Sequence, residues 1–233
     1  MRVLGWNIRR GGRARSDRIV AAIAAHAPDV IVLCEYQESG SAQIIESLRS
    51  SGWPHLLVTT QGARQGGIAV LSGSPLVARP RPVALRDLER HYLAVSVPDH
   101  GFELRAIYGP LGRDVHRQYW DGLLASLRAE SSNAVLVLGD FNSGSPKHDS
   151  TNPAAFSGEF FDRLPAIGFT DLWRARHGED ARAHTWQGSR HPYRLDHAFA
   201  SASLAARMGG CAYSHGERRA AISDHSILLV DIA

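Results

Sequence analysis

The chain has 233 residues, of which 44% are hydrophobic and 21% charged, and its formal net charge is +3 at pH 7. This size and apolar fraction favour one domain over residues 1–233 with a buried core, and two small domains are the less favoured alternative. No run approaches the roughly 18 consecutive apolar residues of a membrane span, and arginines stand where a signal peptide needs its apolar segment. We therefore expect a cytoplasmic protein with no membrane association.

The first part of the chain predicts strands with two helices between them. Residues 2–8 (RVLGWNI) are typical of a strand, and residues 16–27 predict a helix with Ser16 or Asp17 as N-cap and Pro28 after its end. The apolar run at 29–35 (DVIVLCE) predicts a strand buried on both faces, and a second helix is expected near 41–50. Five short apolar runs separated by glycine and proline then predict strands at 55–60, 67–72, 75–85, 92–97 and 102–108.

The second part of the chain repeats this alternation. A helix is expected at about 114–129, a strand at 134–140 (AVLVLGD), and a helix near 154–164. Three further strands are predicted around 184–186, 194–200 and 226–232. The spacing indicates mostly antiparallel sheets, and two sheets packed face to face with helices outside would bury all the apolar runs.

Two cysteines occur, Cys34 and Cys211. Cys34 lies inside the apolar run VIVLCE, where a buried reduced thiol is the ordinary interpretation. A structural disulfide is therefore not expected.

Polar side chains recur where the predicted strands end. Asp140 and Asn142 follow the strand VLVLG two residues apart, so in an extended chain both side chains point to the same side. Other polar residues occupy equivalent positions at or near further strand ends: Asn7, Glu35, Asp196, Asp224 and His225. Several strand ends of a sandwich can meet at one rim, so we expect these side chains to converge.

Carboxylates that converge repel one another and raise one another's pKa values unless a cation lies among them. Here the available ligands are oxygens, from the carboxylates of Glu35 and Asp140 and the nearby amides of Asn7 and Asn142. The sequence offers no plausible Cys/His cluster for zinc. Oxygen ligands suit a hard cation, so Mg²⁺ or Mn²⁺ is the expected cofactor.

Six short motifs occur in the order and rough spacing of the endonuclease/exonuclease/phosphatase superfamily, which this chain resembles from residue 7 to residue 225. The motifs are WNI with Asn7, LCE with Glu35, IYGP with Tyr108, GDFN with Asp140 and Asn142, YRLDH with Asp196, and SDHS with Asp224 and His225. Residues 168–201 are similar to the corresponding region of exonuclease III and related abasic-site endonucleases. The resemblance implies a four-layer α/β sandwich, with two central, mostly antiparallel β-sheets flanked by helices.

The resemblance also implies roles at a metal and around a phosphate. It makes Glu35 the principal metal ligand, with Asn7 close by and Asp224 near the metal or a second metal position.

For catalysis, the resemblance implies that Asp140 aligns or deprotonates the attacking water and that Asn142 donates to a phosphate oxygen. It implies that His225 binds the phosphate, that Asp196 orients this imidazole, and that Tyr108 donates a hydrogen bond to the phosphate. These roles suit the hydrolysis of a phosphodiester, because the attacking water must be placed in line with the leaving oxygen while fixed charge stabilises the transition state.

The chain departs from the family pattern at two positions. Arg9, in NIRR, replaces a polar residue expected near the metal, which puts a second metal ligand in doubt and adds a candidate phosphate contact. Cys34 replaces the usual glutamine before the glutamate.

Further candidates for substrate binding are basic or aromatic. Arg113 follows the YGP turn, and Arg9 begins a basic cluster for which solvated loop charge is the alternative: Arg9, Arg10, Arg13, Arg15 and Arg18. Trp186 and Tyr193 occupy positions where the resemblance to abasic-site nucleases implies aromatic residues around the deoxyribose pocket, with sandwich core as the alternative for Trp186.

The interpretation with most support is a Mg²⁺- or Mn²⁺-dependent phosphodiester hydrolase, a nuclease that acts on DNA with abasic or 3′-terminal sites as candidates. Its partner is then nucleic acid, with no obligate protein partner. The alternatives are a phosphatase or phosphodiesterase for a small or lipid-linked phosphate ester, because the shared core serves such substrates too, and a binding module that has lost catalysis.

Overall fold

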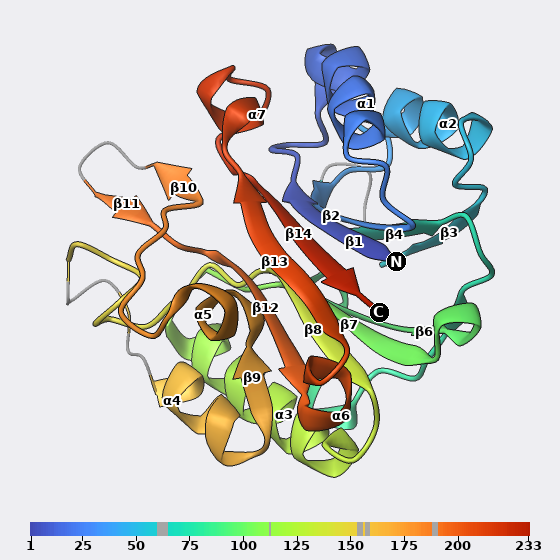
Figure 1. The fold of residues 1–233 in the computed structure, drawn as a ribbon. Coiled ribbons are helices and arrows are strands. Elements are labelled where there is room, and N and C mark those ends of the chain that lie inside the picture. Colours follow the sequence, from blue (N-terminus) through green and yellow to red (C-terminus); the bar gives the residue numbers. More distant parts are fainter. Residues whose placement is uncertain (60–64, 112, 153–155, 157–158, 188–190) are drawn as a thin grey trace.

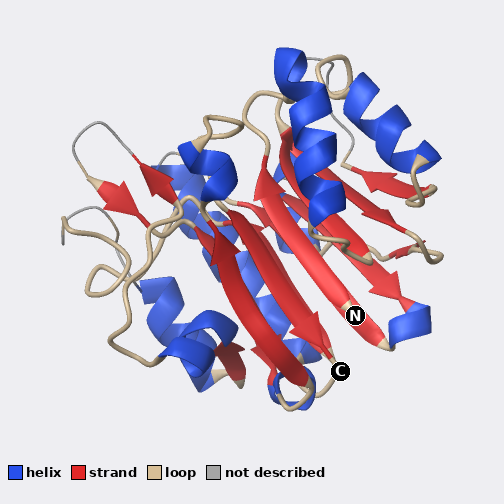
Figure 2. Cartoon of the chain, turned by 45° about the horizontal axis from the view of Figure 1, so that its top comes forward, coloured by secondary structure: helices blue, strands red, loops and turns tan. Residues whose placement is uncertain are grey.

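The computed structural model shows two six-stranded β-sheets packed face to face with helices on both outer faces (Figures 1 and 2). The structure describes the whole chain except residues 60–64, 112, 153–155, 157–158 and 188–190, and the side chains of residues 113, 114 and 159. The arrangement is the four-layer α/β sandwich that the resemblance implied.

The first sheet has the strand order β13-β14-β1-β2-β4-β3. Only β1 and β2 are parallel neighbours in it, and its other pairs are antiparallel. Helices α1 (Ser16–Ala25) and α2 (Ala42–Ser50) pack on its outer face. Its strands are β1 (Arg2–Asn7), β2 (Val30–Tyr36), β3 (His55–Val58), β4 (Gly67–Ser72), β13 (Met208–Ser214) and β14 (Ile227–Ile232).

The second sheet has the order β5-β6-β7-β8-β12-β9, in which only β7 and β8 run parallel. Helices α3 (Arg113–Glu130) and α4 (Glu159–Ala166) cover its outer face. Its strands are β5 (Val77–Ala78), β6 (Tyr92–Val97), β7 (Phe102–Tyr108), β8 (Val135–Asp140), β9 (Phe169–Asp171) and β12 (Asp196–Ser201).

The remaining elements are short. A hairpin outside both sheets is formed by β10 (Trp186–Gln187) and β11 (Pro192–Tyr193), and it projects to one side in Figure 1. The short helices are α5 (Leu172–His177), α6 (Ala202–Ala205) and α7 (Gly216–Arg219), and 3-10 turns occupy Arg13–Arg15, Val83–Leu85, Glu89–His91 and Pro98–His100. Within the described ranges, no helix has both the length and the apolar character that crossing a bilayer requires.

The apolar runs are continuous because the central strands are buried on both faces. In β1, Val3 packs between the two sheets while its neighbour Leu4 packs under α1 and α2. In β8, Leu136 faces the space between the sheets and Val137 faces α3 and α4. Successive side chains of a strand point to opposite faces, so a strand with helices on one face and a second sheet on the other needs apolar residues at every position.

Several elements differ from those predicted. The predicted strand 75–85 is wrong after Ala78, because Pro80 and Pro82 lack the N–H that a sheet ladder needs, and a 3-10 turn follows instead. The short strands β9, β11 and β13 and the short helices α5, α6 and α7 were not predicted. Part of the predicted helix 154–164 and residue 60 of the predicted strand 55–60 lie outside the described residues.

Both cysteines are buried free thiols, as the sequence predicted. Cys34 Sγ donates a hydrogen bond to the carbonyl oxygen of Ile107 at 3.2 Å, which joins β2 to β7 across the space between the sheets. Burial raises the pKa of this thiol well above its usual value, so Cys34 stays protonated and acts as a packing residue.

Candidate active site

The predicted polar residues converge at one end of the two sheets. Asn7 is the last residue of β1, Tyr108 the last of β7 and Asp140 the last of β8, while Asp196 is the first residue of β12. Asp140 is in register with both Tyr108 and Asp196. Because β1 lies in one sheet and β8 in the other, the site is formed by strand ends from both sheets.

Glu35 enters this site through a local irregularity of β2. The register of β2 against β4 shifts between Cys34 and Tyr36, and Glu35 has a φ of +58°. A positive φ is unfavourable for glutamate and persists only where the surroundings enforce it. Here Glu35 Oε2 accepts a hydrogen bond from the Arg10 amide at 2.7 Å, and Oε1 accepts one from Asn7 Nδ2 at 3.1 Å. The bulge directs the carboxylate toward the site.

Asn7 connects the two acidic residues of the site. Its Nδ2 donates to Asp140 Oδ2 at 2.8 Å as well as to Glu35, and its Oδ1 accepts from the Arg9 amide at 2.9 Å. The Asn142 amide donates to Asp140 Oδ1 at 2.9 Å. Asp140 is only 1% exposed, and burial raises the pKa of its carboxyl above the usual range, opposed by His225.

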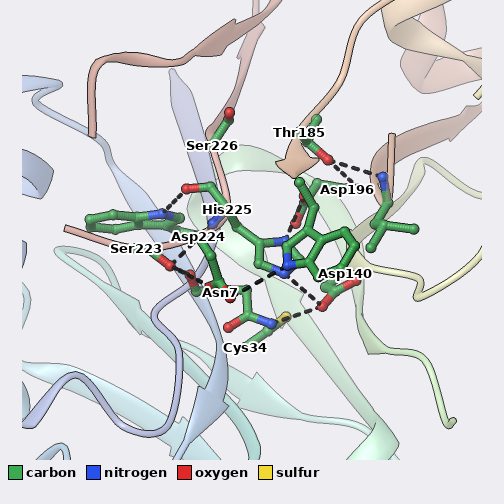
Figure 3. A network of polar contacts seen from close by, with 12 residues as sticks. Asn7, Cys34, Asp140, Thr185, Asp196, Ser223, Asp224, His225 and Ser226 are labelled. Atoms are coloured by element: carbon green, nitrogen blue, oxygen red, sulfur yellow. Dashed lines mark hydrogen bonds and ion pairs between the residues drawn. The ribbon is translucent and has the colours of Figure 1, made fainter. Parts of the chain in front are cut away.

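His225 lies between Asp196 and Asp140 (Figure 3). Its Nδ1 is 2.9 Å from Asp196 Oδ2 and its Nε2 is 3.8 Å from Asp140 Oδ2. Since a carboxylate only accepts, Nδ1 carries the proton and donates to Asp196. Burial by itself lowers the pKa of His225, but Asp196 and Asp140 together raise it to about 10, so the imidazole is positively charged at neutral pH.

Two hydroxyl groups that the sequence analysis did not identify fix the backbone of this site. Thr185 Oγ1 accepts a hydrogen bond from the backbone amide of Asp196 at 3.1 Å, and Ser223 Oγ donates one to the carbonyl oxygen of Asn7 at 2.6 Å. Thr185 lies in the HTW segment and Ser223 begins the SDHS motif. Proximity to recognised motifs was the only signal for either residue, because both contacts join distant parts of the chain.

Arg194, also not identified from the sequence, is fully buried two residues before Asp196. Its guanidinium donates to Asp171 at 2.7 and 2.8 Å, to Asp149 at 3.2 Å and to the Tyr213 hydroxyl at 2.8 Å. Arg194 also lies over the ring of Trp173, 5.0 Å from its centroid. Leaving one partner of such a buried pair without the other costs about 3 to 5 kcal/mol, so this cluster fixes the chain where β12 begins.

His197 follows Asp196 and points to the opposite face of β12, where it is buried. Its Nε2 donates to the carbonyl oxygens of Ser143 and Arg194 at 3.0 and 3.1 Å. Burial and the nearby Arg194 lower the pKa of His197 to about 4. The folded protein therefore holds His197 in its neutral form. The contribution of neutral His197 to folding stability is complete above about pH 6.5, the approximate pKa of histidine in the unfolded chain. This contribution is lost as the pH falls from there toward the pKa of His197 in the folded protein.

We predict that the stability difference between the wild type and a His197→Gln variant changes with pH. The wild-type advantage should shrink by about 2.5 kcal/mol between about pH 7.5 and about pH 4.5, since only the unfolded wild type gains a proton over most of that range. Urea unfolding of both proteins at the two pH values measures this. An advantage that is independent of pH would show that His197 titrates normally in the folded protein.

Tyr108 ends β7, and Asn142 lies in the loop after β8. Asn142 has a φ of +47°, so the extended backbone assumed in predicting that its side chain points the same way as that of Asp140 is wrong. Asn142 Nδ2 donates to the carbonyl oxygen of Gly109 at 2.9 Å, and a Cβ on Gly109 would lie 2.0 Å from the carbonyl oxygen of Phe141. Only glycine permits this approach. Burial, Glu35 and Asp140 raise the pKa of Tyr108, so its phenol stays protonated and can donate a hydrogen bond.

Asp224 lies at the outer side of the site with two partners. Its Oδ2 is 3.5 Å from Arg9 Nε and accepts a hydrogen bond from Trp186 Nε1 at 3.4 Å. Trp186 stacks on Tyr193 across the β10–β11 hairpin, with ring centroids 5.8 Å apart. Both aromatic residues are half-buried and belong to none of the three apolar cores, so the alternative of sandwich core does not apply to them.

The basic cluster of residues 9–18 divides into two groups. Arg15 donates to the carbonyl oxygens of Arg9 and Ile222, and Arg18 donates to the carbonyl oxygen of Ala220. These two arginines connect α1 to the segment before His225. Arg9, Arg10 and Arg13 are exposed beside the site. Arg113 begins α3, but its side chain lies outside the described residues.

Comparison with known proteins identifies the family. Residues 4–225 match the model of the Endonuclease/Exonuclease/phosphatase family, a match that includes the motif residues from Asn7 to His225. The chain belongs to this family. It is accordingly a phosphoesterase, and it has a buried Asp/Asp/His group at the candidate site.

Several relatives within and around this family are informative. An exodeoxyribonuclease of Streptococcus pneumoniae serotype 4 is 26% identical over 227 residues, which cover 82% of each chain. Two solved structures superpose over 100% of this chain and 99% of their own: an AP endonuclease from Archaeoglobus fulgidus (TM-score 0.83, 17% identity) and the 3′ phosphatase NExo from Neisseria bound to product DNA hairpin (0.82, 22%). At these identities the structural likeness shows the fold.

Metal-dependent chemistry is typical of the Endonuclease/Exonuclease/phosphatase family, and the residues present fit a divalent cation. Asp140, Asp196 and His225 offer ligand atoms within 4.8 Å of one another, the one such Asp/Glu/His/Cys group found among the described residues. In this group His225 Nδ1 is already bonded to Asp196. The oxygens of Glu35 and Asp140 form the other side of the site, and a hard cation prefers oxygen ligands.

Proposed function

We propose that this family member is a divalent-metal-dependent phosphodiester hydrolase that acts on DNA, with abasic or 3′-terminal sites as candidate substrates. The observation that carries the proposal is the Asn7 side chain, which donates to Glu35 and Asp140 at once while Asp140 lies 3.8 Å from His225. This chain of contacts joins a cation-binding carboxylate, a water-activating carboxylate and a positively charged imidazole within one buried site.

The residues divide the chemistry among them. Asp140 accepts a hydrogen bond from the attacking water and takes up its proton, for which the raised pKa of its carboxyl is suited. The imidazolium of His225, oriented by Asp196, stabilises the negative charge that develops on the phosphate oxygens. Tyr108 donates a hydrogen bond to the same phosphate, and the Asn142 side chain is a further candidate donor once it leaves Gly109.

Glu35 would bind Mg²⁺ or Mn²⁺ with Asn7 beside it, and Asp224 adds negative charge at the outer side of the site. The cation supplies Lewis acidity and neutralises the phosphate. Around this centre, Arg9 and Arg113 are candidates for phosphate contacts, and Trp186 and Tyr193 form an aromatic platform for a sugar or base.

Support for DNA as the substrate comes from the relatives. The curated relative is an exodeoxyribonuclease, and one structural neighbour was solved with a DNA hairpin. The exposed arginines beside the site suit a polyanion, which binds through salt-sensitive contacts that are independent of sequence.

A substrate panel at one salt concentration tests the proposal. The panel contains plain duplex, abasic duplex, single-stranded DNA, a 3′-phosphate end, RNA and small or lipid-linked phosphate esters. We expect cleavage of DNA with Mg²⁺ or Mn²⁺ and none after EDTA, with recovery when the metal is returned. Preference for the small or lipid-linked esters over every nucleic acid would reject the nuclease proposal, and full activity in EDTA would reject metal dependence.

A Trp186 variant tests whether abasic sites are preferred over other DNA substrates. We predict that Trp186→Ala lowers cleavage of abasic duplex about 5- to 150-fold, because aromatic stacking of the kind that holds a base contributes about 1 to 3 kcal/mol. Cleavage of plain duplex DNA should change little. Trp53→Ala, at a partly buried tryptophan that packs with the first sheet's outer core, is the matched control. Equal losses on both substrates would remove abasic specificity from the proposal.

A further inference from the structure

Arg9 occupies a position from which it can replace a metal ion. Its Nε lies 3.5 Å from Asp224 Oδ2, and the same oxygen accepts the hydrogen bond from Trp186 Nε1. The other oxygen, Oδ1, lies 3.5 Å from the Ser223 hydroxyl. The carboxylate of Asp224 therefore already has a cation and hydrogen-bond donors around it, all of them supplied by the protein.

The backbone that carries Arg9 is fixed at the metal side of the site. Five consecutive residues, 9–13, have positive φ values between 46° and 74°, and three of them are arginines. The amide of Arg9 donates to Asn7 Oδ1 and the amide of Arg10 donates to Glu35 Oε2. The Arg9 carbonyl accepts from Arg15 Nη2 at 2.5 Å. This left-handed turn holds the Arg9 backbone beside Asn7 and Glu35, so the Arg9 side chain starts from a fixed position next to the candidate metal site.

The carboxylates of the site differ in their cationic partners. Asp196 is paired with His225 and Asp224 with Arg9. Glu35 accepts hydrogen bonds from an amide nitrogen and an asparagine, and Asp140 reaches the same imidazole as Asp196 only at 3.8 Å. Among the described residues, Glu35 is therefore the one of these four carboxylates with no side-chain cation within ion-pair distance, because Asp140 shares the imidazolium of His225 with Asp196. A bound cation is needed to balance the charge of Glu35.

We propose that this enzyme holds a single divalent cation, at Glu35, and that the Arg9 guanidinium takes the place of a second cation at Asp224. The inference rests on the proposed function, because it concerns the same metal-dependent site. Arg9 then has two effects: it prevents Asp224 from binding metal, and it keeps a fixed positive charge where the substrate phosphate approaches.

Counting bound Mn²⁺ tests the inference without measuring activity. Free Mn²⁺ is quantified by electron paramagnetic resonance during titration of the full chain, for the wild type, Arg9→Lys and Arg9→Asp. Aspartate tolerates a positive φ better than arginine does, so Arg9→Asp is compatible with the turn, and thermal unfolding checks that each variant is folded. We expect one ion per chain for the wild type and Arg9→Lys, and two for Arg9→Asp. Adding Asp224→Asn to Arg9→Asp should restore one.

The outcomes separate this inference from the proposed function. Two ions on the wild type, or a single ion on a folded Arg9→Asp variant, would overturn the role of Arg9 and leave a metal-dependent hydrolase. No Mn²⁺ on the wild type would overturn both, because the proposed function itself requires a cation at Glu35. One ion on the wild type and a second that appears only with Arg9→Asp supports the inference.

Discussion

Replacing Asp140 with asparagine is expected to lower kcat on DNA by about 10²- to 10⁴-fold, the contribution of a well-placed general base. Asparagine keeps the size of the side chain, and its Oδ1 can accept the hydrogen bond that the Asn142 amide now donates to Asp140 Oδ1. It cannot take a proton from water, and it adds a donor that opposes the Asn7 Nδ2. Single-turnover cleavage of a labelled oligonucleotide measures the chemical step directly.

Asp99→Asn is the matched control for this variant. Asp99 is exposed in the turn between β6 and β7, at the end of the second sheet opposite to the site. It should leave kcat unchanged. Unfolding in urea establishes whether Asp140→Asn is folded. A folded Asp140→Asn protein with wild-type kcat would remove Asp140 from the catalytic step.

The positions of the acidic site residues could be predicted because each depends on a local pattern. Asp140 ends an apolar run, and Asp196 begins another. A buried strand has a definite end, and the polar residue found there must face either solvent or a site. Their convergence followed once two face-to-face sheets were assumed, since the ends of neighbouring strands lie close together.

Other parts of the site depend on contacts that no local pattern encodes. The positive φ of Glu35 is imposed by amides and side chains from β1 and the following turn. The Arg194 cluster joins Asp149 and Asp171, which lie 45 and 23 residues away in the chain. An arginine in a sequence is most simply interpreted as exposed, and only the folded chain shows that its charge is paired within the core.

The missed elements of the fold have a similar cause. Strand β13 reads MGGCAYS, which lacks strong alternation and includes two glycines, and it forms because β14 offers an open edge. Strand β9 has three residues and pairs only with β12. Short or glycine-containing strands are specified by the neighbouring strand more than by their own residues, so tertiary context decides them.

Asp196→Asn is expected to lower kcat and also to change the dependence of kcat on pH. Asp196 and Asp140 raise the pKa of His225 to about 10 against the effect of burial, and Asp196 is the nearer of the two carboxylates. Without that charge the pKa of His225 falls, and the ring becomes neutral at a lower pH than in the wild type. A neutral imidazole stabilises the phosphate charge less well. We expect kcat to fall about 10²- to 10³-fold near neutral pH.

The loss should grow as the pH rises and diminish as it falls, because at low pH the imidazole of the variant is protonated again. Profiles of kcat against pH for the wild type, Asp196→Asn and Asp162→Asn measure this. Asp162 is exposed on the outer helix α4 and its variant should follow the wild-type profile. A uniform loss for Asp196→Asn at every pH would mean that Asp196 only orients the ring. A loss that increases with pH would mean that the negative charge of Asp196 maintains the imidazolium of His225, as the proposed function requires.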